Sequence, residues 1–272
     1  FNDSLPKIAA MEITPNQKAV TVFLAGNSTV VDQDKEPWAA WGQIFPRFFE
    51  PGKICIANYA ESGEALRSFY NAKRLQKVLS LMKKGDYLFI EFAHNDQKEK
   101  GEDVGPYTSY TKSLQQYIRE VRKKGGIPIL ITSMHRRNFD SEGKVVNTLG
   151  DYPDAMRKVA QEEKVELIDL NAMSKILYET WGPEASVKAF VHYAANTFTR
   201  QAEALKDNTH FNPYGATELA KCIVSAIKKQ KLALSKYLRK DIPAYTPAKP
   251  LPFEKFYWPL SLSMSSIKPD GN

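Results

Sequence analysis

Short apolar runs alternate with amphipathic segments along the chain from residue 19 onward. Each run is rich in β-branched or aromatic residues and stops at a glycine or a polar cluster, a pattern typical of buried parallel strands. The first run is the clearest, because it breaks off abruptly at Gly26-Asn27-Ser28. The five predicted strands are the run from Ala19 to Gly26, Lys53–Ala57, Tyr87–Phe92, Ile127–Ser133 and Val165–Asp169.

The segments between these strands predict helices. Parallel strands need crossover connections, so the alternation predicts an α/β fold: a three-layer α/β/α sandwich around a five-stranded parallel sheet. In the segment that starts at Pro37, Trp38, Trp41, Phe45 and Phe48 recur at helical spacing, and we expect them in the core. Five other helices are predicted. The first extends toward Leu81, the second runs from Pro106 to Gly125, the third spans Pro153–Lys164, the fourth ends near Trp181, and the last begins at Asn212 and Pro213.

The pattern indicates three regions along the chain. Residues 1–18 form an irregular lead-in, residues 19–235 form one α/β domain, and residues 236–272 form a proline-rich tail packed on the surface. Within the domain, the segment from Gly182 to Arg200 has no clean periodicity. We expect it to be a long loop that shapes a substrate groove.

Composition and charge narrow the possible classes of function. The 272 residues are 43% hydrophobic and 25% charged, as in ordinary globular proteins. No apolar run approaches the roughly 20 residues that span a bilayer, so no membrane association is expected. The formal charge of +7 suits a polyanionic partner. The lysines are scattered, however, and no nucleic-acid-binding motif accompanies them, so nucleic acid is not the expected partner.

The two cysteines do not build a disulfide framework. Cys55 lies in a predicted strand and Cys222 in a predicted helix, and we expect two buried free thiols. The chain opens on Phe1 without a charged and apolar leader, which favours a processed mature chain.

A serine follows the first predicted strand, and an aspartate and a histidine precede the last predicted helix. Ser28 follows the first strand, where it is either a helix N-cap or a nucleophile. Asp207 and His210 are three residues apart before the last helix, so their side chains can meet on one turn or cap that helix. A nucleophile, a base and a group that orients the base are the three parts of a catalytic triad.

Four segments together resemble the SGNH (GDSL) hydrolase superfamily. Their order and spacing match its four blocks, and the sequences FLAGNSTV, ESGEALRSF, FIEFAHNDQ and DNTHFNPYGA are most similar to rhamnogalacturonan acetylesterases. The resemblance implies a flavodoxin-like SGNH hydrolase fold. The four segments are Gly26–Thr29, Ser62–Gly63, His94–Asp96 and Asp207–His210.

The resemblance also implies the role of each site residue. It makes Ser28 the nucleophile, His210 the general base and Asp207 its orienting partner. The oxyanion hole would consist of the Ser28 amide, the Gly63 amide and the Asn95 side chain, because glycine leaves its N–H accessible and an amide donates without charge. No metal or organic cofactor is expected.

Three further residues are candidate substrate contacts. Asn27 departs from the family, which usually has Asp at this position, and it removes a negative charge beside the nucleophile. His94 belongs to the matched third block and is expected to structure its loop rather than act as a base. His192 has no motif support but precedes Tyr193, and the pair could touch substrate.

The expected function is therefore that of a serine carbohydrate esterase. It would remove O-acetyl groups from an acetylated polysaccharide or oligosaccharide, with rhamnogalacturonan, an acidic pectin, as the expected substrate and a secreted or periplasmic location. One alternative is an acetylesterase for another glycan, such as xylan, or for small acyl esters. Another is an inactive glycan-binding protein, suggested by Asn27 and by the aromatic residues Trp38, Trp41, Trp181 and Tyr193.

Overall fold

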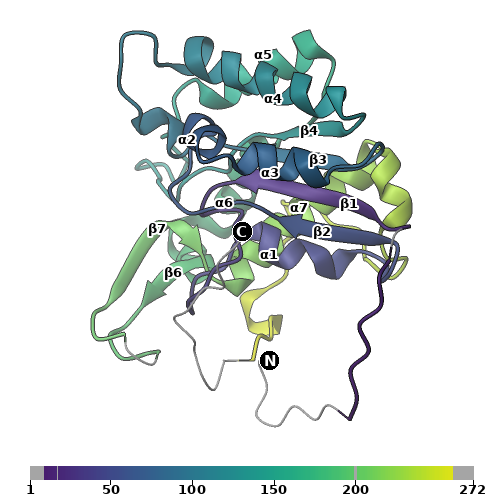
Figure 1. Ribbon diagram of the computed structural model, residues 1–272. Helices are drawn as coiled ribbons and strands as arrows, with labels where there is room; N and C mark the ends of the chain where they lie inside the picture. The colour runs from purple at the N-terminus through teal and green to yellow at the C-terminus, as the bar shows by residue number, and fades with distance from the viewer. Residues whose placement is uncertain (1–8, 17, 199–200, 260–272) are drawn as a thin grey trace.

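A parallel sheet of five strands lies at the centre of the molecule, in the order β2-β1-β3-β4-β5 (Figure 1). The computed structural model describes residues 9–16, 18–198 and 201–259; residues 1–8 of the predicted lead-in and 260–272 of the predicted tail lie outside these ranges. The sheet confirms the predicted topology. Its strands are β1 (Val20–Gly26), β2 (Ile54–Asn58), β3 (Tyr87–Glu91), β4 (Ile127–Ile131) and β5 (Glu166–Ile168).

Helices cover both faces of this sheet and complete the predicted three layers (Figure 1). One face packs against α2 (Leu66–Asn71), α3 (Arg74–Leu81), α4 (Thr111–Lys123) and α5 (Tyr152–Glu163). The other packs against α1 (Trp41–Ile44), α6 (Leu170–Ala185) and α7 (Pro213–Lys229).

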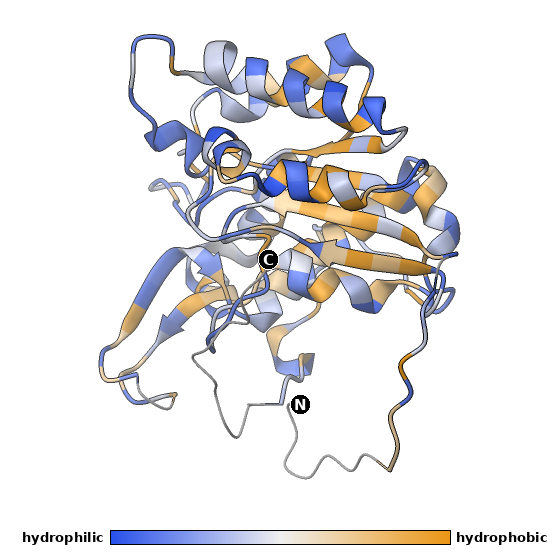
Figure 2. Cartoon of the chain, viewed as in Figure 1, coloured by the Kyte–Doolittle hydropathy of each residue, from blue (hydrophilic) through white to orange (hydrophobic). Residues whose placement is uncertain are grey.

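The apolar runs are continuous because the strands are buried on both faces. In β1, Val22 and Leu24 join the cluster beneath α1, α6 and α7, whereas Phe23 and Ala25 join the cluster beneath α2 to α5. Successive side chains of a strand point to opposite faces, so a strand between two helix layers needs apolar residues at every position. Figure 2 shows the result, with hydrophobic residues gathered along the strands and hydrophilic ones on the outer helix surfaces.

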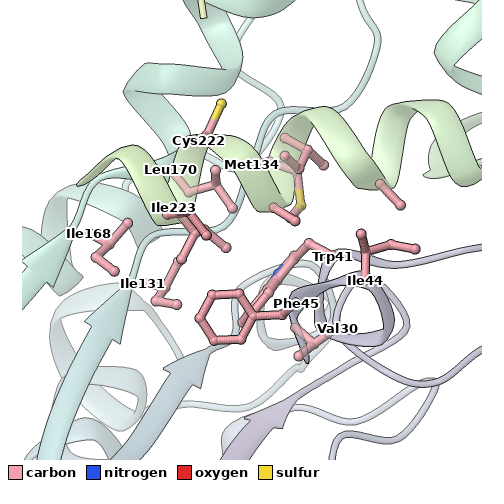
Figure 3. Close-up of a cluster of buried hydrophobic side chains, with 14 of the residues drawn as sticks. Val30, Trp41, Ile44, Phe45, Ile131, Met134, Ile168, Leu170, Cys222 and Ile223 are labelled. Atoms are coloured by element: carbon pink, nitrogen blue, oxygen red, sulfur yellow. The ribbon is translucent and has the colours of Figure 1, made fainter. Parts of the chain in front are cut away.

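The first predicted helix is shorter than its pattern suggests. α1 begins at Trp41, and the residues Phe45–Phe48 form a 3₁₀ turn that contains Pro46. Proline lacks the N–H that would continue an α-helix. Trp41 and Phe45 are fully buried, as predicted, and Figure 3 shows both in the cluster that faces α7. Trp38 does not belong to this core, because it lines a surface cleft.

The predicted helix ending near Leu81 is two helices. Lys73 adopts φ 63° between α2 and α3, a left-handed conformation that interrupts the helix. The helix predicted to start at Pro106 opens with a π turn over Pro106–Tyr110 and continues as α4. The regular part of α6 ends as predicted at Trp181, because Gly182 adopts φ 75°.

The predicted loop from Gly182 to Arg200 is wrong in its structured part. The described residues of this segment contain β6 (Phe190–Tyr193), which pairs antiparallel with β7 (Leu205–Phe211) in a separate two-stranded sheet. The register shifts between Phe190 and Val191, so that Phe190 lies opposite Phe211 but Val191 lies opposite Asp207. Residues 208–210 therefore bulge out of the pairing.

Both cysteines are free, but only one is buried. Cys222 on α7 is buried, and Cys55 on β2 is exposed, which corrects the prediction of two buried thiols. The reason is that β2 is an edge strand of the sheet and has one neighbour only. None of the helices in the described ranges combines the length and the apolarity that crossing a membrane requires.

The chain after α7 returns across the core on the side of α1, α6 and α7. Ile242, Tyr245, Phe256 and Trp258 pack against the cluster beneath these helices. The Tyr214 hydroxyl on α7 also donates a hydrogen bond to the Leu251 carbonyl at 2.6 Å. These contacts attach the described part of the tail to the helix that follows β7.

The start of α7 offers a test of this packing. A Cβ atom on Gly215 would lie 2.1 Å from the Ala189 carbonyl oxygen, so Gly215→Ala forces the backbone apart. We expect the free energy of unfolding in urea to fall by about 1–3 kcal/mol. Lys229→Ala, at the exposed end of the same helix, should change it by less than about 0.5 kcal/mol. A gain in stability for Gly215→Ala, as helix propensity alone would give, would contradict this packing.

Candidate active site

Ser28 lies in a tight turn at the carboxyl end of β1. The backbone N–H groups of Val30 and Val31 both donate to the Asn27 carbonyl at 3.0 Å, which closes the turn. Gly26 permits it, because a Cβ atom there would lie 2.4 Å from a Val30 methyl group. No helix begins at Ser28, since the next one, α1, starts at Trp41 after its N-cap Ala40. The alternative of Ser28 as a helix N-cap is therefore wrong.

The side chains of Ser28, His210 and Asp207 form one chain of hydrogen bonds. Ser28 Oγ lies 2.8 Å from His210 Nε2, and His210 Nδ1 lies 2.7 Å from Asp207 Oδ2. With the proton of His210 on Nδ1, the carboxylate accepts it and Nε2 is free to accept the serine proton. The structure thus brings together the three residues that the sequence singled out.

The bulge in β7 sets the geometry of Asp207 and His210. Asp207 Oδ1 accepts hydrogen bonds from the backbone N–H groups of Thr209 at 2.8 Å and His210 at 3.0 Å. The two side chains therefore meet on one turn as predicted, but that turn is a strand bulge. The N-cap of α7 is Asn212, whose Oδ1 accepts from Gly215 N at 3.1 Å, so Asp207 does not cap this helix.

Asp207 is ionised over a wide pH range. Burial alone would raise the pKa of Asp207, but the hydrogen bonds that its carboxylate accepts from His210 and Thr209 outweigh burial and hold this pKa at about 2. The carboxylate is therefore available to orient the imidazole at any pH at which the protein would work.

Ser28 and His210 lie in an open cleft of about 690 Å³ at the carboxyl edge of the sheet. Gly63 and Asn95, the other predicted oxyanion donors, line the same cleft. Gly63 adopts φ 86°, a conformation that glycine takes without strain. The remaining lining residues are Gln33, Asp34, Lys35, Trp38, Ser62, His94, Lys98, Arg136 and Thr209.

The Asn95 amide is fixed in one orientation. Asn95 Nδ2 donates to the Glu64 carbonyl at 3.1 Å, and Lys98 Nζ donates to Asn95 Oδ1 at 2.9 Å. Because an ammonium group can only donate, Lys98 identifies the atom it contacts as the oxygen. One N–H of the amide group is engaged by Glu64, which leaves the second for a ligand.

Glu91, which was not a candidate from the sequence, is fully buried and contacts the turn that contains Ser28 through Thr29. Its Oε2 accepts from Thr29 Oγ1 at 2.9 Å and from Trp41 Nε1 at 3.2 Å, and Ser133 contacts its Oε1. Burial raises the pKa of Glu91 against the lowering effect of these hydrogen bonds. In the sequence this carboxyl looks like an ordinary strand residue, because its partners are far away along the chain.

The three candidate substrate contacts have different positions. Asn27 is fully buried, with Oδ1 3.1 Å from Thr29 N, so the structure does not bring it to the cleft. His94 does line the cleft. His192 is not among the cleft residues, and its Nε2 lies 2.8 Å from Asn208 Oδ1.

Across the described ranges, no group of three or more His, Cys, Asp or Glu side chains is arranged to hold a metal ion.

Comparisons with known proteins agree with this geometry. Residues 23–217 match the model of the GDSL-like Lipase/Acylhydrolase family. The chain is 41% identical to rhamnogalacturonan acetylesterase RhgT of Bacillus subtilis over 82% of its length and 95% of that protein. It is 35% identical to the probable rhamnogalacturonan acetylesterase YesY of the same organism, over 81% of its own length and 98% of YesY.

A solved structure agrees with the fold. The crystal structure of Bacillus subtilis protein YxiM superposes with a TM-score of 0.68 at 29% identity. The match covers 79% of this chain and 58% of the longer YxiM chain.

The low pKa of Asp207 predicts how stability depends on pH. The folded-state pKa of about 2 is below the ordinary value of 3.8, so the ionised carboxylate stabilises the fold above pH 4, and this stability is lost as the pH falls toward 2. We expect the free energy of unfolding of Asp207→Asn to be about 2 kcal/mol lower than that of the parent chain at pH 7. This difference should shrink at pH 3. Urea titrations at pH 7, 5 and 3 measure it.

The matched control is Asp103→Asn, an exposed carboxylate on a loop. Its free energy of unfolding should stay within about 0.5 kcal/mol of the parent chain at pH 7. A difference for Asp207→Asn that is the same at pH 7 and pH 3 would show that the carboxylate charge is not its cause.

Proposed function

Because the chain belongs to the GDSL-like Lipase/Acylhydrolase family, we propose that its cleft removes acetyl groups from acetylated rhamnogalacturonan, with Ser28 as the nucleophile. The chain is a carboxylic ester hydrolase, like the acetylesterases it resembles. The observation that carries the proposal is the 2.8 Å approach of Ser28 Oγ to His210 Nε2, with Asp207 on the other ring nitrogen. An inactive binding protein would have no need of this arrangement.

The reaction proceeds in two steps through an acetyl-enzyme. Ser28 Oγ attacks the acetyl carbonyl carbon while His210 Nε2 takes the hydroxyl proton, and Asp207 stabilises the resulting imidazolium. The tetrahedral intermediate then breaks its bond to the sugar oxygen, which receives that proton and leaves as a sugar hydroxyl. Water, deprotonated by His210, attacks the acetyl-enzyme in the same way and releases acetate.

The negative oxygen of the tetrahedral intermediate would be held by the Ser28 amide, the Gly63 amide and Asn95 Nδ2. The contacts of Asn95 support this role, since Lys98 and Glu64 fix its amide and leave one N–H available. Donors that are already oriented need no reorganisation when charge develops on the oxygen.

The pectic substrate is supported by the names of the relatives and by the charge of the cleft. RhgT is a rhamnogalacturonan acetylesterase, and YesY is a probable one. The cleft is lined by three cationic side chains, Lys35, Lys98 and Arg136, and one carboxylate, Asp34, which favours an acidic polymer over a neutral one. Since a polymer of this kind lies outside a cell that degrades it, we also propose that the enzyme acts outside the cytoplasm.

Ser28→Ala tests the nucleophile. Acetate release from acetylated rhamnogalacturonan should fall by more than about a thousandfold while circular dichroism shows an intact fold, because a triad without its nucleophile retains little catalysis. A serine-directed fluorophosphonate should add its mass to the peptide that contains Ser28 in the parent chain and not in the variant. Ser80→Ala, exposed on α3, is the control and should behave like the parent chain.

Two results would contradict these assignments. Full activity in Ser28→Ala would exclude it as the nucleophile. A higher kcat/KM for acetate release from acetylated xylan than from acetylated rhamnogalacturonan would exclude the pectic substrate but keep the esterase activity, because the triad determines the reaction and not the leaving group.

Asn95→Ala tests the oxyanion hole. Because the donor acts mainly on the transition state, kcat should fall by about 10²- to 10³-fold with a smaller change in KM. Asn95→Asp should be at least as impaired, since a carboxylate repels the developing oxyanion. Asn71→Ala, exposed at the end of α2, is the control. An unchanged kcat in Asn95→Ala would remove this side chain from the oxyanion hole.

A further inference from the structure

One wall of the cleft carries two cations that have no carboxylate partner. Lys98 Nζ donates to the neutral amide of Asn95 at 2.9 Å, and within the described ranges neither Lys98 nor Arg136 forms a salt bridge. The third cation of the cleft, Lys35, differs because its neighbour in the chain, Asp34, brings a carboxylate to the same cleft. The positive charge of the cleft is therefore concentrated at Lys98 and Arg136.

Arg136 contacts neutral groups only. Its Nη1 donates to Thr148 Oγ1 at 3.1 Å, and its Nη2 donates to the His94 carbonyl at 3.2 Å. Both nitrogens also reach the Gln97 amide oxygen when that amide is turned to satisfy its contacts. The guanidinium is half-buried, so its charge loses part of its hydration without gaining a counter-ion. An anion bound from the cleft would supply that counter-ion.

His94 adds an unsatisfied polar group to the same wall. Its side chain is 3% exposed, and neither ring nitrogen has a hydrogen-bond partner among the described residues. Burial, followed by the charges of Arg136, His210 and Lys98, lowers the pKa of His94 well below its ordinary value. The ring therefore adds no positive charge beside the two cations, and its N–H lacks an acceptor among the described residues, which is costly for a buried group.

Both cations keep N–H groups that are free to donate to a carboxylate. The Arg136 Nε–H has no acceptor among the described residues, and Lys98 uses one of its three N–H groups on Asn95. A carboxylate has two oxygens and accepts from a guanidinium and an ammonium at once. Lys98 also contacts Asn95, so an anion held here would lie beside the ester that reacts at Ser28.

We propose that Lys98 and Arg136 bind the carboxylate of a uronic acid residue in the acetylated substrate and so select acidic glycans over neutral ones. This inference rests on the proposed function and goes beyond it, because it assigns the recognised group and the residues that recognise it. Lys98 is also a positioning residue for Asn95, so the test must separate the two roles.

The test compares two forms of one substrate. An acetylated rhamnogalacturonan oligosaccharide is used with its carboxylates free and with them converted to methyl esters, which removes the charge but keeps the acetyl ester. The parent chain should show a kcat/KM for acetate release about tenfold higher on the free acid, mostly through KM, because charge-assisted hydrogen bonds are the stronger ones. This preference should shrink in 0.5 M salt because exposed charges are screened.

Arg136→Met and Lys98→Met should each reduce the preference severalfold. Any disturbance of Asn95 lowers the rates on both forms alike and cancels in their ratio. Lys98 is exposed, so its variant provides a result even if loss of the half-buried Arg136 impairs folding. Lys158→Met, an exposed lysine on α5, is the control and should keep the preference of the parent chain.

The outcomes separate this inference from the proposed function. Equal kcat/KM on the two forms in the parent chain, or an undiminished preference in Lys98→Met and Arg136→Met, would overturn the carboxylate site and leave the acetylesterase intact. No acetate from either form, from a chain that still hydrolyses 4-nitrophenyl acetate, would overturn the pectic substrate and this site with it.

Discussion

The hydrogen bond between Ser28 and His210 is the constraint on which the rest of the site depends. It joins residues 182 positions apart, one at the end of β1 and the other on the bulge of β7. The packing of α7 on the sheet helps to hold the end of β7 near Ser28. Gly215 on α7 lies against the Ala189 carbonyl, and Asn212 links the same helix to the Lys188 carbonyl before β6 at 2.8 Å. A side chain at Gly215 would displace His210 from Ser28.

Glu91 provides the matching support beneath Ser28. Thr29 Oγ1 lies 2.9 Å from Glu91 Oε2 and 3.0 Å from Asn27 Oδ1, but a hydroxyl has a single hydrogen to donate. The Thr29 hydroxyl therefore donates to one of these two oxygens at a time, and the backbone N–H of Thr29 donates to Asn27 Oδ1 at 3.1 Å when the hydroxyl donates to Glu91. The Glu91 carboxyl and the Asn27 amide thus both hold the turn that contains Ser28, through their contacts with Thr29. Asn27 thus contacts the residue that follows Ser28, although it is buried.

The sequence predicted those features that depend on local pattern. Strands buried on both faces are visible as apolar runs, and the spacing of Asp207 and His210 predicted their contact. Glu91 could not be predicted, because its hydrogen bonds with Thr29 and Ser133 join residues that are distant in sequence. The strand β6 was not predicted, because it has only four residues and is stabilised by pairing with β7. Likewise, only the order of strands shows that Cys55 lies on an edge and is exposed.

In the proposed mechanism, the contact between Lys98 and Asn95 would couple substrate recognition to catalysis. The ammonium group polarises the amide through Oδ1, which would strengthen Nδ2 as a donor to the proposed oxyanion. A substrate carboxylate bound at Lys98 neutralises part of this polarisation, so the same contact that improves binding weakens oxyanion stabilisation. Arg136 reduces this conflict, since it attracts the carboxylate without touching Asn95. The attraction of Arg136 for the carboxylate would therefore act on the ground state and the transition state alike, and such uniform binding lowers KM without raising kcat.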